Sequence, residues 1–174
     1  MLLRLAALLA LTATAMAATT EWRQETALAG VTYDGRADAD GVSAVAGWRL
    51  DGGVYVSDEH FTLNFVSAKG RTGVMLSTFV SRAEDGVATF TAGKAMSVPV
   101  IDNFAYTDIN CAEVGSEWNP EQTKFIVGIV PKTAASNDAG QVGSLIAAAK
   151  VDLTAGTITP VDPKGIYCIQ EEGH

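Results

Sequence analysis

Apolar and polar residues alternate along much of this chain, which is the period-two pattern of a β-strand with two different faces. Residues 61–65 read Phe-Thr-Leu-Asn-Phe, so the two phenylalanines and the leucine are predicted to face a core, with Thr62 and Asn64 on the opposite face. The same alternation predicts a second core-facing set further along, formed by Phe125, Val127 and Ile129.

From residue 42 onward, short apolar runs are separated about every eight to twelve residues by turn residues, a spacing typical of antiparallel strands. Glycine in these turns accepts the positive φ of tight hairpins. The fold is therefore predicted to be all-β, an antiparallel meander forming a small barrel or sandwich. The predicted turns between strands are Asp51-Gly52-Gly53, Lys69-Gly70, Asp85-Gly86 and Ala155-Gly156.

The segment 144–153 is rich in alanine, which favours a helix by intrinsic propensity. It leads, however, through a Thr-Ala-Gly turn into residues 157–159, and this pair of runs is typical of a hairpin. We therefore predict a strand within 144–153. The preceding segment, 132–143, is small and polar with only Val142 to bury, so a mobile surface loop is expected there.

The N-terminus has the features of a secretory signal peptide. Arg4 precedes an apolar stretch, and Ala15-Met16-Ala17 matches the small-x-small pattern of a cleavage site. We expect residues 1–17 to be removed, leaving residues 18–174 as a single β domain of about 157 residues, which is enough for one hydrophobic core. No later stretch is apolar enough to insert in a membrane as a helix. The expected location is periplasmic or secreted.

Two cysteines in an exported chain predict a disulfide between Cys111 and Cys168, because oxidising compartments form and keep such bonds. The alternative is a reactive or metal-binding thiol. That alternative requires a nearby histidine or a Cys-x-x-Cys spacing, and the sequence around the two cysteines has neither.

Without Arg4 the chain carries 11 basic and 20 acidic residues, a net charge of −9. Such a charge repels nucleic acid and favours a cationic partner. Acidic residues concentrate between residues 95 and 123, where there is no lysine or arginine, and Trp118 in this stretch is a candidate interface anchor. The candidate contact residues are Asp108, Glu113, Glu117, Trp118 and Glu121. The alternative is a loop whose acids point separately into solvent.

Other constellations do not predict a catalytic, metal or cofactor site. The segment 34–41 resembles a calcium loop, but the required register places Arg36 and Gly47 at ligand positions. His60 directly follows Ser57-Asp58-Glu59, and such neighbours do not assemble a catalytic triad. The sequence does not exclude a pair of carboxylates for glycoside hydrolysis, because that chemistry depends on the distance between the two groups in space.

Together these patterns predict an exported binding module that captures or inhibits a cationic protein or peptide through an acidic surface near the disulfide. One alternative is a structural or surface component of the bacterial cell envelope. A second alternative is a small-ligand carrier or an enzyme, since a barrel interior can hold one apolar molecule.

Overall fold

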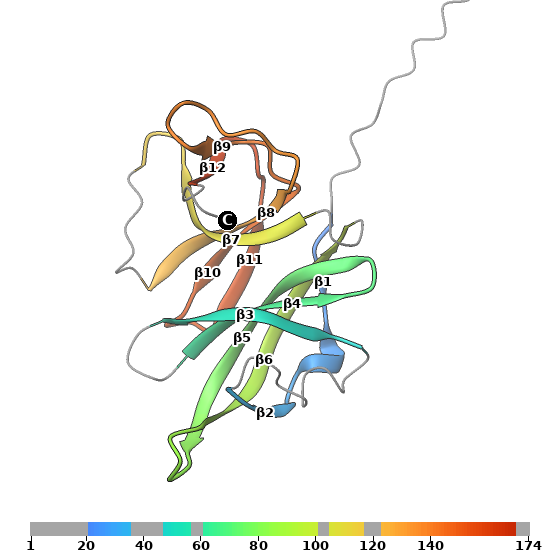
Figure 1. The fold of residues 1–174 in the computed structure, drawn as a ribbon, viewed down its shortest axis with the longest axis vertical. Helices are drawn as coiled ribbons and strands as arrows, with labels where there is room; N and C mark the ends of the chain where they lie inside the picture. The colour runs from blue at the N-terminus through green and yellow to red at the C-terminus, as the bar shows by residue number, and fades with distance from the viewer. Residues whose placement is uncertain (1–20, 36–46, 57–60, 101–104, 117–122, 170–174) are drawn as a thin grey trace, which may run out of the picture.

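The structure is a computed structural model that describes residues 21–35, 47–56, 61–100, 105–116 and 123–169, with only the backbone of residues 54–56. Its strands form two antiparallel sheets of six strands each (Figure 1). Sheet A contains β1 (Arg23–Gln24), β2 (Thr32–Asp34), β3 (Arg49–Val56), β4 (Phe61–Ala68), β5 (Arg71–Arg82) and β6 (Ala88–Pro99). Sheet B contains β7 (Ala105–Glu113), β8 (Lys124–Pro131), β9 (Gln141–Val142), β10 (Ala147–Asp152), β11 (Thr157–Val161) and β12 (Ile166–Ile169). The predicted all-β fold is confirmed.

The strand order agrees with the predicted meander in sheet A but not throughout sheet B. In sheet A the order is β1-β6-β5-β4-β3, so β3 to β6 follow one another as hairpins, and β2 also pairs with β6. In sheet B the order is β11-β10-β8-β7-β12-β9. The last strand, β12, therefore pairs with β7 on one side and with β9 on the other, so sheet B is not a simple meander.

Three of the four predicted turns are confirmed as hairpin turns, and their glycines have positive φ: Gly70 (73°), Gly86 (85°) and Gly156 (61°). The fourth prediction is wrong, because Asp51-Gly52-Gly53 lies inside β3. The register of β3 against β4 shifts between Leu50 and Gly52, so the extra residue forms a bulge. Gly52 has a φ of 146°, a conformation that side chains disfavour, which explains the glycine at a bulge as well as at a turn.

The main core lies between the two sheets. Leu63 from β4 and Val74 from β5 pack in one cluster with Val127 from β8 and Ile158 from β11, and all four side chains are fully buried. Phe61, Phe65 and Phe125 pack against the same cluster, and Ile129 is buried in a neighbouring one. The predicted core-facing residues of both alternating segments are thus confirmed.

The opposite face of sheet A is also buried, because the N-terminal segment folds over it. This segment includes the 3-10 helix η1 (Thr26–Leu28) and β2. Asn64, on the far face of β4, is only 5% exposed and donates to the Tyr33 hydroxyl at 2.7 Å. The Tyr33 hydroxyl donates in turn to Ser77 Oγ at 2.8 Å. Polar residues can occupy this face because each finds a hydrogen-bond partner.

A short N-terminal clasp, residues 22–25, joins the sheets. Its strand β1 pairs with β6 of sheet A, while Trp22 Nε1 donates to the carbonyl of Ala148 in sheet B at 3.0 Å. Glu25 accepts from Ser97 Oγ at 2.6 Å and from Arg71 Nε at 3.1 Å. The clasp therefore makes a partly buried polar contact on sheet A and an indole hydrogen bond to sheet B.

The predicted disulfide is confirmed. Cys111 of β7 and Cys168 of β12 are register partners on neighbouring strands, and both are buried. The two sulfur atoms lie over Gly128 of β8, where a Cβ atom would come within 2.6 Å of one of them. Val142 is buried in the same cluster, as the sequence predicted, but it lies in β9, so the prediction of a loop over the whole of 132–143 is wrong at residues 141–142.

The alanine-rich segment 144–153 is confirmed to contain a strand, β10. Ala147, Ala148 and Ala149 are all buried, because β10 is a central strand and core clusters cover both of its faces at these three residues, whereas Lys150 is exposed. Small side chains fit both faces, so the run lacks the alternation of a half-exposed strand.

Several sequence predictions fall on residues outside the described ranges. They are the signal peptide, most of the calcium-like segment, and His60, Glu117, Trp118 and Glu121. Within the described residues, no helix has the length and apolar character needed to cross a membrane.

Candidate functional site

The described part of the predicted acidic surface is occupied by internal contacts. Asp108 Oδ1 accepts from the amide of Asn110 at 2.8 Å, where β7 shifts register against β8. Glu113 forms an ion pair with Lys150 at 2.7 Å, and both side chains are about half exposed. Two of the candidate carboxylates thus already have partners. Capture of a cationic protein by this surface stays a prediction, since its other candidate residues lie outside the described ranges.

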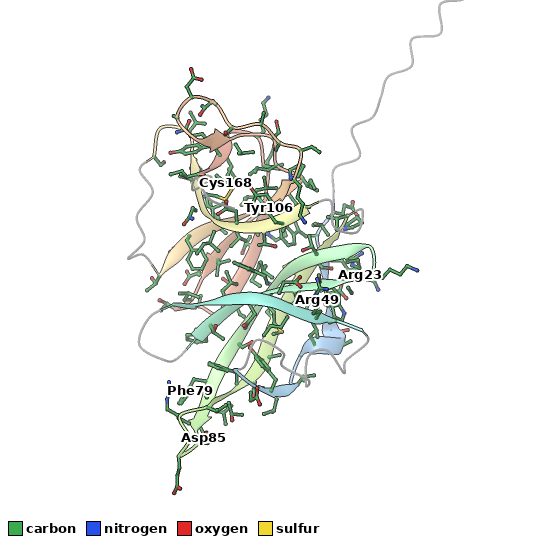
Figure 2. All side chains as sticks on the ribbon, in the orientation of Figure 1. Arg23, Arg49, Phe79, Asp85, Tyr106 and Cys168 are labelled. Atoms are coloured by element: carbon green, nitrogen blue, oxygen red, sulfur yellow. A yellow bond between two sulfur atoms is a disulfide. The ribbon has the colours of Figure 1, made fainter. Side chains whose placement is uncertain are left out.

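The described residues form an open groove where the two sheets meet, with a volume of about 650 Å³. One wall comes from the beginning of β3 and the β4–β5 hairpin of sheet A, and the other from the beginning of β7 and the residue after β8. In Figure 2, Arg49 is labelled on sheet A and Tyr106 on sheet B. The lining residues that carry the argument are Arg49, Asp51, Lys69, Arg71, Tyr106 and Lys132.

Two of the basic residues that line the groove have acidic partners. Arg49 Nε lies 2.6 Å from Asp51 Oδ1, and its guanidinium also donates to Ser67 Oγ at 3.3 Å. Arg71 is held by Glu25 of the N-terminal clasp and by Ser97 Oγ at 2.8 Å. Each guanidinium charge is therefore balanced by a carboxylate of the protein, although the side chain of Arg49 is 69% exposed.

The other two cations, Lys69 and Lys132, form no ion pair with any of the described residues. Lys69 lies in the β4–β5 turn and Lys132 directly follows β8, and both side chains are exposed. Once Arg49 and Arg71 are balanced by their partners, the described lining keeps a local charge of +2. This is notable because the whole chain carries a net charge of −8.

The uncharged lining adds hydrogen-bonding groups and a small apolar surface. Ser67, Thr72 and Thr107 contribute hydroxyl-bearing side chains, while Phe65 and Val100 contribute apolar ones. Among the described residues there is no cluster of three or more potential metal ligands. The arrangement is suited to binding an anion by charge and hydrogen bonds.

Tyr106 stays neutral over a wide pH range. Burial, and secondly the negative charge of Asp108, raise the pKa of its hydroxyl above the ordinary value of 10.0. Because the fold favours the neutral form, the contribution of Tyr106 to stability is fully present below about pH 10 and is lost as the pH rises through the raised pKa.

We therefore expect Tyr106 to ionise later than an exposed tyrosine when tyrosinate absorbance is followed during an alkaline titration. Asp108→Asn should lower the pKa of Tyr106 only in part, because burial, the larger cause, remains. The difference in tyrosinate absorbance between wild type and Tyr106→Phe reports the ionisation of Tyr106 alone. Loss of an early-ionising tyrosine in Tyr106→Phe would contradict the expectation.

Sequence reasoning missed the groove. Its cations come from β3, the β4–β5 turn, β5 and the end of β8, which are far apart along the chain. The one local signal is Lys69-Gly70-Arg71, two cations on either side of a turn glycine. The sequence predicts a polar loop at Lys132, and Lys132 does lie outside the strands. The local sequence does not indicate which part of the molecule this residue faces.

Comparisons with protein-family models, with curated proteins and with solved structures find no match to this chain.

Proposed function

We propose that this protein is an exported binding module that takes an anionic ligand in the groove between its two sheets. The observation that carries the proposal is the pair of lysines, Lys69 and Lys132, which line one groove without an acidic partner among the described residues. The disulfide supports export, because such bonds persist in oxidising compartments. Of the functions considered from the sequence, the small-ligand carrier is the nearest to this proposal, but the ligand proposed here is anionic and binds between the sheets, whereas the sequence suggested an apolar molecule inside a barrel.

Size and electrostatics both favour a ligand site. A volume of about 650 Å³ lies within the range of roughly 300–1,000 Å³ usual for small-molecule sites. Unpaired charge of one sign in a concave surface raises the local concentration of the opposite ion. Because surplus acid elsewhere gives the whole chain a net charge of −8, the local excess of positive charge is not a consequence of bulk composition.

The proposal is tested by titrating the mature, oxidised protein with citrate at fixed ionic strength and following backbone amide shifts by NMR. Shifts should concentrate at the β4–β5 turn and at the start of β7. Lys69→Glu should weaken binding about tenfold, equivalent to about 1.4 kcal/mol, because it removes one attraction and adds a repulsion.

Lys164→Glu is the matched control. Lys164 is exposed in the segment between β11 and β12 and does not line the groove, yet its reversal changes the net charge equally. Citrate affinity should stay near that of wild type in this variant. Equal weakening by both variants would show that citrate responds to net charge alone, and amide shifts spread over the surface would place no site in the groove.

A further inference from the structure

We infer that the ligand is a small molecule with two or more acidic groups, which bridges sheet A and sheet B by contacting Lys69 and Lys132 together. This inference rests on the proposed function and specifies the chemical class of its ligand. The shared chemistry is two or three carboxylate or phosphate groups on a compact molecule.

The first step is the placement of the two lysines. Lys69 lies in the β4–β5 turn of sheet A, whereas Lys132 follows β8 of sheet B, so they stand on the two walls of one groove. A single carboxylate fills only a small part of a volume of about 650 Å³. A ligand with separated acidic groups can contact both walls, and both ammonium groups then gain a counter-charge.

The second step concerns which donors are available. The planar guanidinium groups of Arg49 and Arg71 favour two-pronged recognition of an anion, but both already contact a carboxylate of the protein. The remaining ammonium groups are compact point charges on flexible stems, which impose little geometric selection. Selection by Lys69 and Lys132 should therefore follow the number and spacing of the ligand's charges more than the shape of each acidic group.

The third step limits the ligand's length. The chain has a net charge of −8, whereas the described residues of the groove have a local charge of +2. Electrostatic influence extends about 8 Å at physiological salt. A ligand that fits within the groove experiences mainly Lys69 and Lys132, whereas a long polyanion would extend over a surface that is acidic on balance. A compact anion is therefore favoured over a polymer.

The test compares acetate, succinate, citrate and dextran sulfate at equal ionic strength, using calorimetry and the NMR shifts of the groove. Affinity should rise about tenfold from acetate to succinate and rise again for citrate, with dextran sulfate no tighter per molecule than citrate. Bound citrate should also raise the melting temperature, because a ligand that binds only the folded state stabilises it.

Lys132→Gln and Lys69→Gln remove one contact each without reversing a charge. Either variant should bind succinate only about as well as acetate, while acetate affinity changes little, and Lys164→Gln should behave like wild type. Loss of the difference between succinate and acetate in both groove variants is the signature of bridging, since a general charge effect would weaken all anions together.

The outcomes separate the two proposals. Absence of citrate binding in the groove would overturn both. Equal groove affinity for acetate, succinate and citrate would overturn the bridging inference and leave the anion-binding function in place. Tighter binding of dextran sulfate than of citrate would show that the ligand is a polymer. Full citrate affinity in Lys132→Gln would show that sheet B does not take part.

Discussion

Removing the disulfide between Cys111 and Cys168 is expected to lower the free energy of unfolding by about 4 kcal/mol. The two cysteines are 57 residues apart, and closing a loop of that length removes a corresponding amount of chain entropy from the unfolded state. The bond also fastens β12, a strand of four residues that connects β7 to β9. A loss of this size is a large part of the stability of an ordinary domain.

The measurement is urea unfolding of wild type and of Cys111→Ala/Cys168→Ala, each with and without reductant. Reductant should destabilise wild type to about the level of the double variant, and it should leave the double variant unchanged. A difference below about 1 kcal/mol between oxidised and reduced wild type would contradict the prediction. Amide exchange should become faster first in β12 and β9, whose pairing depends on Cys168 and its neighbours.

Gly73→Ala is expected to destabilise the protein by about 3 kcal/mol, because overpacking of a buried site forces the backbone to move. Gly73 lies in β5 opposite Ser97 of β6. A Cβ atom there would overlap the carbonyl oxygen of Met96 and lie 2.6 Å from the Cα atom of Ser97. Movement of Ser97 would also disturb its hydrogen bonds to Glu25 and Arg71, which hold the N-terminal clasp.

Gly143→Ala is the matched control for this substitution. Gly143 lacks a positive φ, and nothing lies within 4 Å of the Cβ position. Thermal unfolding should therefore show little change in Gly143→Ala and a clear decrease in melting temperature in Gly73→Ala. Similar melting temperatures for the two variants would mean that β5 and β6 separate at Gly73 at little cost.

Much of sheet A was predictable because its signals are local. Alternation along residues 61–65 predicts which side chains face the core, and glycines such as Gly70 and Gly86 identify hairpin turns by the φ that they permit. The same reasoning failed at Gly52, because a bulge and a turn both use a glycine with positive φ. Only the pairing of β3 with β4 distinguishes the two.

The candidate site was not predictable in the same way. The sequence drew attention to Asp108 and Glu113 because acidic residues cluster there, but the fold gives Asp108 a backbone partner and Glu113 a lysine from β10. Conversely, Lys69 and Lys132 belong to separate turns and stand out only when they line one groove. Charge compensation depends on distances in space, and sequence neighbours report those distances poorly.

The sequence by itself determined the all-β class, most of the hairpin turns and the pairing of Cys111 with Cys168, because these follow from strand periodicity, backbone conformation and the presence of just two cysteines. The tertiary structure alone decided that β12 returns to β7, that the N-terminal segment with η1 and β2 covers sheet A, and that Lys69 and Lys132 share a groove. The physical reason is that these features depend on which surfaces of distant segments pack together, and local periodicity and turn residues carry no information about that packing.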